Sequence, residues 1–486
     1  MAGVTPMFLQ ELAHVRKRFQ ALAGSLVGVG ITAFSRIVPA CFLDSYHVAT
    51  VSRTADLPLL RKRTDIFCLE EAGGTLPEQR RNSASLLAHA LTRGYLNSLP
   101  DPKHLFLYQS YPELEDLARE AGWIPLANPA DLRLRLRERA FFQQMAADLD
   151  LCQAPGAIQP IAVLHEKDYQ GWAGDLGPEL VVQLPDIAQG GGRGTFFIRS
   201  AQDYDRLRER LKGHVWRDIP LTSILIRRFI KGTAASVAVC VTRHGILISG
   251  LQKQLIDLPY CANPAENGIF CGHVWDGNPW APAVRSAAIK QAEKVGKYVA
   301  ALGYRGILGI DFVIDEKAEG VYPLEINPRL TGAFPMVSLL HIQKGIIPLD
   351  IFHILEFMDL PYRIDVAELN RRYQTPLKGS HLLLFFPPEG QDIRGFRVRP
   401  GLYEVGPRDK AVRFVREGTG YRDIRNQNQF VVMDGPPLSG TGGRISGDSF
   451  SRLCHLLFSY PVSDAGPALT PHARRVLHWI YGLNDE

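Results

Sequence analysis

The sequence predicts a protein of class α/β and α+β, with an N-terminal parallel-sheet domain, a core of two subdomains and a small C-terminal α+β unit. Three observations predict this class. Short apolar segments alternate with helical stretches over residues 1–127, which is typical of a parallel sheet covered by helices. Pairs of strand-like segments with short connections follow, as in α+β units. The length of 486 residues suffices for about three domains, and 46% hydrophobic with 22% charged residues is an ordinary globular composition.

The first predicted unit, residues 1–127, opens with an amphipathic helix and continues as alternating strands and helices. The stretches SLLAHALTRGYL and PELEDLAREAG have helical spacing. GVGITA (28–33) matches a dinucleotide-binding fingerprint only in part, because the second strand ends in Ser52-Arg53 and offers no acidic residue for a ribose. Tight strand-to-helix packing is therefore the preferred interpretation. The predicted strands are SLVGVGITAFS (25–35), YHVATVS (46–52), DIFCLEE (65–71), HLFLYQS (104–110) and WIPLAN (123–128).

Residues 128–235 and 236–365 form the predicted core. The first subdomain has a helix over 133–151, ended by Pro155-Gly156, and a hairpin over 179–200. A second hairpin-like piece covers 223–250. The helix VRSAAIKQAEKVGKYVAALG and the strand pair GILGIDFVID and GVYPLEINPR belong to the second subdomain. The C-terminal unit, residues 366–486, is richer in Gly, Pro and Arg, with helices predicted near SFSRLCHLLFSY and PHARRVLHWIYGL.

Charge and cysteine content exclude several classes of protein. The chain has 55 Lys plus Arg against 50 Asp plus Glu, and the net charge of +5 is small for a nucleic-acid binder of this length. The basic clusters RLRLRER (133–139) and LLRKRTD (59–65) are predicted to be solvated helix faces. The seven cysteines form no CxxC pair, so neither a disulfide framework nor a zinc ribbon is expected. The N-terminus has no signal-peptide pattern and no window reaches about 18 apolar residues, so we expect a cytoplasmic protein without a membrane partner.

The segment LEINPRLTGAFP (324–335) carries the strongest chemical signal. Glu325, Asn327 and Arg329 recur at every second position, so on a β-strand they share one face. If residues 316–320 form the loop to the preceding strand, Asp311 lies opposite Glu325. Two opposed carboxylates repel unless a cation lies between them. A divalent cation such as Mg²⁺ is the obvious candidate, with Asn327 as a neutral oxygen ligand and Arg329 as a fork for phosphate. The alternative is a surface hairpin with solvated charges.

A second motif, AQGGGRG (188–194), lies inside the predicted hairpin 179–200. Glycines allow backbone N–H groups to approach phosphates closely, so the segment is a candidate anion cradle. It is neither a Walker A loop, since no GK[ST] follows, nor a GxGxxG that opens a helix. The alternative is a hairpin tip without a ligand.

These motifs, with the hinge-like RRFIKG (227–232) between them, resemble the ATP-grasp superfamily of carboxylate-amine ligases. The resemblance covers roughly residues 128–360, and its most specific part is the D…ExN pair with the NPR that follows. The N-terminal unit looks like the pre-ATP-grasp domain of that superfamily. The resemblance implies ATP between the two core subdomains and two Mg²⁺ ions on Asp311, Glu325 and Asn327.

The resemblance also implies the remaining site residues. Family members usually have a lysine where this chain has Gln183, and hinge glutamates near Arg227 and Ala234. Arg193 or Arg228 could replace the missing lysine charge. Glu138-Arg139 occupies the place of an upstream D-K pair, where some relatives have arginine. The nucleotide-binding residues implied are Arg139, Gln183, Gly190, Gly191, Gly192, Arg193, Gly194, Arg228, Phe229 and Ile230, and the catalytic residues implied are Asn327 and Arg329.

The activity implied is phosphorylation of a small-molecule carboxylate by ATP to an acyl phosphate, followed by attack of an amine and release of ADP and phosphate. Within the superfamily the domain order is loosely similar to that of pheganomycin-type peptide ligases, so an amino acid or peptide is the expected amine. Two alternatives stay open. One is a nucleotide-binding regulator without turnover, suggested by Gln183, Arg227 and Ala234, and the other is a biotin-dependent carboxylase, for which the sequence offers no biotinyl MKM segment. A homodimer is the commonest outcome for soluble enzymes.

Overall fold

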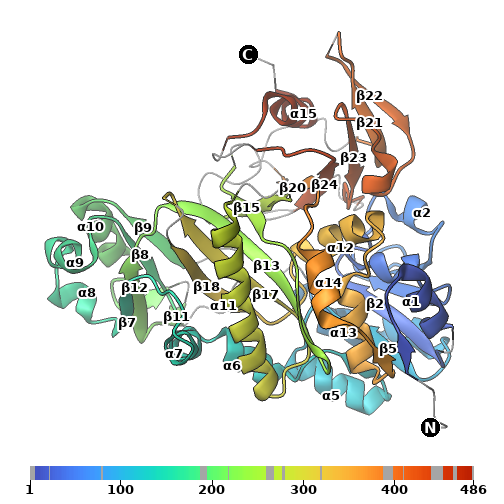
Figure 1. Ribbon diagram of the computed structural model, residues 1–486, viewed down its shortest axis with the longest axis horizontal. Coiled ribbons are helices and arrows are strands. Elements are labelled where there is room, and N and C mark those ends of the chain that lie inside the picture. The colour runs from blue at the N-terminus through green and yellow to red at the C-terminus, as the bar shows by residue number, and fades with distance from the viewer. Residues whose placement is uncertain are drawn as a thin grey trace.

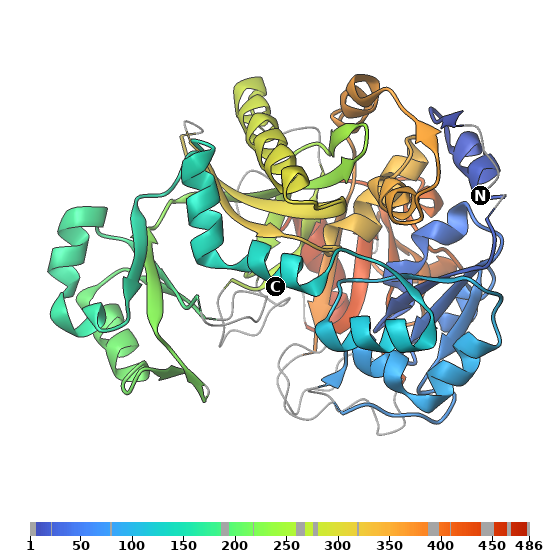
Figure 2. The same cartoon turned by 90° about the horizontal axis from the view of Figure 1, so that it is seen from below.

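The computed structural model describes most of the chain and shows an elongated molecule (Figures 1 and 2). A small lobe lies at one end, and the N-terminal domain lies at the other. No helix of the described part is long and apolar enough to cross a membrane. The described residues are 6–20, 22–77, 80–185, 194–216, 218–258, 268–275, 280–317, 320–386, 398–408, 410–438, 452–463 and 468–483.

The N-terminal domain has a five-stranded sheet in the order β4-β3-β2-β5-β6, and every neighbouring pair is parallel. This confirms the predicted parallel sheet. The central strand β2 is buried along its whole length, as expected for a strand covered on both faces. Helix α5 begins with Pro112, has Glu113 and Glu115 in its first turn and ends at Gly122 in the left-handed conformation, so each terminus has favourable chemistry. The elements are β1 (Met7–Phe8), α1 (Leu12–Phe19), β2 (Ser25–Gly30), η1 (Phe34–Arg36), η2 (Val38–Cys41), β3 (Tyr46–Thr50), α2 (Leu57–Leu60), β4 (Asp65–Cys68), α3 (Ser83–Ala88), α4 (Ala90–Asn97), β5 (Lys103–Phe106), α5 (Pro112–Ala121) and β6 (Ile124–Leu126).

The small lobe is built on a four-stranded antiparallel sheet in the order β7-β12-β8-β9 (Figure 1). Strands β8 and β9 form the hairpin predicted over 179–200. Ser200 caps α10 by accepting a hydrogen bond from the Asp203 backbone N–H at 3.2 Å. The lobe and the helices leading into it comprise α6 (Ala130–Arg137), α7 (Arg139–Asp148), β7 (Gly156–Pro160), α8 (Val163–Glu166), α9 (Tyr169–Leu176), β8 (Leu180–Gln183), β9 (Thr195–Ile198), α10 (Ala201–Arg210), β10 (Val215–Trp216), β11 (Ile219–Pro220) and β12 (Ser223–Arg228).

A large sheet runs in the order β18-β17-β13-β15-β16-β20-β24-β23-β21-β22, with β14 paired to β13. It joins strands from residues 236–365 to strands from residues 366–486, and the division of these residues into two domains stays a prediction. The elements are β13 (Gly232–Thr242), β14 (Gly245–Ile248), β15 (Gln252–Ile256), β16 (Phe270–Val274), α11 (Pro282–Ala301), β17 (Gly306–Asp315), β18 (Val321–Asn327), α12 (Ala333–Gln343), α13 (Leu349–Phe357), β19 (Tyr362–Arg363), α14 (Val366–Tyr373), β20 (Ser380–Phe385), β21 (Gly401–Val405), β22 (Val412–Arg416), η5 (Tyr421–Asp423), β23 (Gln429–Met433), β24 (Arg452–Phe458) and α15 (Pro471–Tyr481).

Three local predictions were wrong. The helix predicted near SFSRLCHLLFSY is strand β24, which pairs with β20 and β23, because a short apolar run suits a buried strand as well as a helix. The single helix predicted over 133–151 is two helices, since Glu138 has an extended backbone with ψ 130°. The cluster RLRLRER is not a fully solvated face, because Arg133 is buried. The helix predicted near PHARRVLHWIYGL is confirmed as α15.

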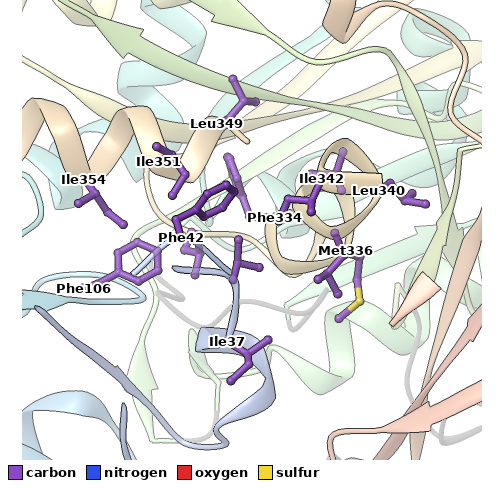
Figure 3. Close-up of a cluster of buried hydrophobic side chains, with 14 of the residues drawn as sticks. Ile37, Phe42, Phe106, Phe334, Met336, Leu340, Ile342, Leu349, Ile351 and Ile354 are labelled. Atoms are coloured by element: carbon purple, nitrogen blue, oxygen red, sulfur yellow. The ribbon is translucent and has the colours of Figure 1, made fainter. Parts of the chain in front are cut away.

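The largest apolar cluster lies between the N-terminal sheet and helices α12 and α13. Figure 3 shows part of it, with Phe42 and Phe106 from the N-terminal domain among side chains of the two helices. This core joins the N-terminal domain to the subdomain that carries β17 and β18, and it fixes the position of the strands that carry the predicted site.

Candidate active site

The strands β17 and β18 are antiparallel, and Asp311 is the register partner of Glu325. The pairing predicted from the hairpin count is therefore confirmed at this position. It also holds for Ile310 with Ile326, but the register shifts after Asp311, where Phe312 pairs with Pro323. The extra residue between the two pairs is Leu324, so a bulge sits directly beside the two carboxylates.

Amide groups surround the carboxyl group of Asp311. Asn327 Nδ2 donates to Asp311 Oδ2 at 2.8 Å and lies 3.4 Å from Glu325 Oε1. Gln254 on β15 donates from Nε2 to Asp311 Oδ1 at 2.8 Å. Burial and, next, the negative charge of Glu325 raise the pKa of Asp311, while the hydrogen bonds from Gln254 and Asn327 and the charge of Arg329 oppose the rise. The negative charge of each carboxylate therefore disfavours ionisation of the other, and a cation placed between them would stabilise both in the ionised form.

Arg329 ties this cluster to the N-terminal domain. Its Nη2 donates to Asn327 Oδ1 at 2.8 Å, and its Nη1 donates to the Leu330 carbonyl at 3.2 Å and to the hydroxyl of Tyr108. The guanidinium carbon lies 4.9 Å from the centre of the Tyr108 ring. Tyr108 follows β5, at the carboxyl end of a parallel strand, where α/β sheets commonly bind ligands.

Arg139 approaches the same carboxylates from the helices that lead into the small lobe. It is the first residue of α7, and its Nη2 lies 3.3 Å from Glu325 Oε2. The break at Glu138 places Arg139 at the start of a new helix. Arg137, at the end of α6, is close enough to Arg329 for the two positive charges to interact. Burial lowers the pKa of Arg137 most, and the charge of Arg329 is the next largest cause of this lowering.

The small lobe contributes a third cation, Arg227 on β12. Its Nη2 donates to Gln183 Oε1 at 2.7 Å, and Gln183 Nε2 donates to Thr195 Oγ1 at 3.2 Å. Burial and, next, the charge of Arg139 lower the pKa of Arg227 to about 10, while the charge of Glu325 opposes the shift. Arg227 and Gln183 therefore face the carboxylate site from the small lobe.

The structure places the other predicted nucleotide residues as follows. Arg228 points away from Gln183 and donates from Nε to the Leu176 carbonyl at 2.6 Å. The Phe229 backbone N–H donates to the Glu179 carbonyl at 2.8 Å. Gly194 has a φ of 79°, which favours glycine, and its carbonyl accepts from the Leu184 N–H at 2.9 Å. Ile230 lies directly after Phe229, and Gly190, Gly191, Gly192 and Arg193 lie outside the described residues.

Sequence reasoning missed three contributors to this site: Tyr108, Gln254 and the inward orientation of Arg227. Gln252 and Gln254 alternate along a strand, and that pattern could have placed Gln254 on one face. Tyr108 offered no comparable signal, because 221 residues separate it from Arg329 in the chain.

A family model for the ATP-grasp domain matches residues 181–333, a range that runs from the Gln183 strand to beyond Arg329. The chain therefore contains an ATP-grasp domain. This confirms the family and the fold class inferred from the sequence.

Two curated relatives illustrate the similarity. The chain is 27% identical over 225 residues to the carbamoyl phosphate synthase arginine-specific large chain of Geobacillus stearothermophilus, which covers 45% of this chain and 19% of the relative. It is 30% identical over 108 residues to the [butirosin acyl-carrier protein]–L-glutamate ligase of Niallia circulans, which covers 21% of this chain and 23% of the relative. The chain thus spans about a fifth of the length of the curated relatives that it matches.

Solved structures with a similar fold cover more of the chain. The biotin carboxylase domain of Hydrogenobacter thermophilus 2-oxoglutarate carboxylase, solved with MgADP, ADP and bicarbonate, has a TM-score of 0.57 at 15% identity and covers 90% of this chain and 87% of its own. The N5-carboxyaminoimidazole ribonucleotide synthetase PurK, solved with ADP, has a TM-score of 0.52 at 12% identity and covers 94% and 97%. At these identities the likeness shows the fold alone.

The donor set of the predicted metal site fits Mg²⁺. Within the described ranges, no group of three or more His, Cys, Asp or Glu side chains could hold a metal ion. The predicted set needs only two carboxylates and one carboxamide, and Mg²⁺ in proteins commonly takes one or two carboxylates together with substrate phosphates and water. Ligation by the Asn327 oxygen would require its amide to rotate, because Oδ1 now accepts from Arg329.

Proposed function

We propose that this protein is an ATP-dependent ligase that phosphorylates a small carboxylate to an acyl phosphate, joins it to an amine and releases ADP and phosphate. The observation that carries the proposal is the opposed pair Asp311 and Glu325, flanked by Asn327 and Arg329 and faced by Arg139. Apart from Arg139, which lies upstream, these groups lie within residues 181–333, the range that the ATP-grasp family model matches.

The charges around the pair favour a polyphosphate ligand. Arg137, Arg139, Arg227 and Arg329 interact with Glu325 or with one another, whereas Asp311 and Glu325 are the carboxylates at the centre. Four guanidinium groups outnumber two carboxylates, and the surplus positive charge suits an anion with several charges. A nucleoside triphosphate with its metal ion meets that requirement.

In this proposal each residue of the candidate site has a specific role. Asp311, Glu325 and Asn327 would hold Mg²⁺, which neutralises charge on the phosphates when it is bound. Arg329, fixed by Asn327 and Tyr108, presents its guanidinium to the transferred phosphoryl group and the substrate carboxylate. Arg227 and Gln183, on the small lobe, reach the remaining phosphates. The glycine-rich segment 188–194 would cover them, and backbone atoms around Phe229 and Ile230 would receive adenine.

The relatives support the chemistry in outline. Carbamoyl phosphate synthase and the acyl-carrier-protein–L-glutamate ligase are, by name, a synthase of an acyl phosphate and a ligase for an amino acid. For this chain we propose an amino acid or peptide as the amine. We also propose that it acts in the cytoplasm, on small molecules without nucleic acid or membrane, and as a homodimer, the state of the biotin carboxylase domain that shares its fold.

A nucleotide-binding regulator is the second candidate function. Two positions favour it. Gln183 on β8 stands where family members usually have a lysine, and Ala234 on β13 lies near the position of a hinge glutamate. Arg227 offsets the first change by placing its guanidinium beside Gln183.

Release of ADP from ATP and Mg²⁺ tests the proposal, measured over a matrix of small carboxylates and amino acids. We expect one acid and amine pair to stimulate release, and Glu325→Gln to abolish the stimulation. ATP binding without turnover for any pair would favour the regulator.

A further inference from the structure

A pocket of about 310 Å³ lies between the N-terminal domain and the α12–η5 region. Helix α1 and the turn η2 form one wall, and the end of α12 and η5 form the opposite wall. None of its lining residues takes part in the contacts around Asp311 and Glu325 described above. The lining residues are Leu12, Arg16, Ala40, Cys41, Phe42, Arg63, Ile342 and Arg422.

Three guanidinium groups converge on this pocket from three different segments. Arg16 donates from Nη2 to the Cys41 carbonyl at 3.0 Å, and Arg422 donates from Nη2 to the Ile342 carbonyl at 2.6 Å, so each side chain is held against a wall. All three arginines line the pocket together with Cys41. Burial raises the pKa of the Cys41 thiol, the charges of Arg63, Arg422 and Arg16 lower it, and the charge of Asp350, which does not line the pocket, raises it.

The positive charge in the pocket has no acidic partner in the lining. Neither Asp nor Glu lines the pocket, and within the described part of the chain none of the three arginines forms an ion pair. Neighbouring basic residues are paired: Arg61 with Glu71, and Lys62 with Glu417. A guanidinium has five N–H donors, and in the described part of the chain one backbone carbonyl accepts from Arg16 and one from Arg422.

The floor of the pocket is apolar. Phe42 and Ile342 are buried and belong to the main core, and Figure 3 shows both among the side chains of α12 and α13. Leu12 and Ala40 extend the apolar surface toward the opening. Cations above an apolar floor suit a ligand with a charged group and a short hydrocarbon part, and a volume near 300 Å³ is at the small end of ligand pockets.

We infer that this pocket binds a small organic anion, with a carboxylate or phosphate group held by Arg16, Arg63 and Arg422 and a short apolar segment on Phe42 and Ile342. The site is separate from the proposed ATP site. It bridges the N-terminal domain and the α12–η5 region, so a bound anion would hold these two parts together.

Alkylation of Cys41 by iodoacetamide, followed by mass spectrometry of its peptide, tests this inference, because Cys41 lines the pocket and reports on it alone. The probes are glutarate and glycerol 3-phosphate, and their uncharged analogues glutaramide and glycerol serve as controls at constant ionic strength. We expect at least one anion to slow alkylation in a saturable way and neither neutral analogue to do so. The two anions distinguish a carboxylate ligand from a phosphate ligand.

Arg63→Gln is the main variant, since its side chain makes no hydrogen bond within the described residues and its loss should leave the walls in place. Lys62→Gln is the matched control, with the same change of charge at the neighbouring position outside the pocket. We expect Arg63→Gln to raise the half-protecting concentration about tenfold, as for a lost charge-assisted hydrogen bond, and Lys62→Gln to leave it within about twofold.

Three outcomes would overturn the inference. The first is that neither anion protects Cys41 from alkylation. The second is that Arg63→Gln and Lys62→Gln weaken the protection equally, which would indicate a diffuse effect of charge. The third is that Cys41 is protected in the absence of any probe and that this protection increases with protein concentration, which would indicate that a second copy of the chain covers the pocket.

Discussion

Arg227 Nη2 on β12 lies 2.7 Å from Gln183 Oε1 on β8, so a guanidinium group stands beside the amide at the edge of the carboxylate site. The guanidinium is buried and is close enough to Arg139 for their charges to repel. Burial and a neighbouring cation both disfavour a charged group, and a bound polyanion offsets both. The pair Arg227 and Gln183 therefore has the properties expected of a phosphate contact, with the charge supplied from the neighbouring strand.

We expect Arg227→Gln to raise the KM for ATP about tenfold or more with a smaller effect on kcat, because it removes a charge-assisted contact from the phosphates. Steady-state kinetics with ATP as the varied substrate measures this. Arg228→Gln is the matched control, since the Arg228 side chain turns to the Leu176 carbonyl. Introducing Gln183→Lys into the Arg227→Gln variant should lower the KM again, and a KM for ATP equally raised by both single arginine variants would contradict the assignment.

The carboxylate pair gives the second prediction. Glu325→Gln and Asn327→Asp should each reduce kcat at least 100-fold while the melting temperature stays close to that of the wild type, because each alters the charge or ligand set around Mg²⁺ on an intact strand. Disturbing residues behind metal ligands commonly costs 10 to 100-fold, and loss of a ligand should cost at least as much. Activity over a range of Mg²⁺ concentrations and thermal unfolding measure the two effects. Wild-type turnover at limiting Mg²⁺ in either variant would show that the pair is structural.

The raised pKa of Asp311 predicts how stability depends on pH and Mg²⁺. A carboxyl group with a higher pKa in the folded state binds more protons there than in the unfolded chain, so its contribution to stability is present at low pH and is lost as pH rises through the folded-state pKa. Without Mg²⁺, wild-type stability should therefore decline more from pH 5 to 8 than that of Asp311→Asn. Mg²⁺ should reduce this difference, because the cation stabilises the ionised carboxylate. If the melting temperatures of the wild type and of Asp311→Asn change equally with pH, both with and without Mg²⁺, the result would contradict a buried Asp311 carboxyl group whose ionisation is disfavoured by Glu325.

Arg329→Lys provides the third functional test. A lysine retains the charge but cannot donate to Asn327 Oδ1 and to the Tyr108 hydroxyl at the same time in a planar fork, so we expect kcat to fall at least tenfold. Tyr108→Phe removes the hydroxyl and keeps the ring beneath the guanidinium, and it should cause a smaller loss. Unchanged kcat in Arg329→Lys would remove Arg329 from the phosphate site.

The sequence predicted those parts of the site that depend on local periodicity. The two-residue repeat of Glu325, Asn327 and Arg329 and a short hairpin sufficed to pair Asp311 with Glu325. The same count failed after Asp311, because the bulge at Leu324 depends on packing that a sequence pattern does not encode. The strand assignment of β24 was missed for a related reason: its apolar run gains its hydrogen bonds from β20 and β23, which lie far away in sequence.

Contacts between distant segments were the hardest to predict. Arg329 meets Tyr108 only because the core of the N-terminal domain packs on α12 and α13 and fixes two strand ends side by side. The inward orientation of Arg227 depends on which face of β12 the helix α9 covers, and the sequence Arg227-Arg228 alone does not decide between the two residues. The glycine-rich segment, whose role also comes from the resemblance, stays a prediction for Gly190 to Arg193.

The last prediction concerns which phosphate bond breaks. The carboxylates Asp311 and Glu325 and the guanidinium of Arg329 are grouped at one end of the site, whereas Arg227 and Gln183 lie on the small lobe. A metal ion on the two carboxylates and the guanidinium would neutralise negative charge on the terminal phosphate while it is transferred, which is what γ-phosphoryl transfer requires. The products should therefore be ADP and inorganic phosphate in amounts equal to the new amide, which chromatography of the nucleotides measures. Hydroxylamine should replace the amine and yield the hydroxamate of the substrate acid, because it intercepts an acyl phosphate. AMP and pyrophosphate would instead require an adenylate on the acid, and finding them would reject the mechanism while leaving the ATP site in place.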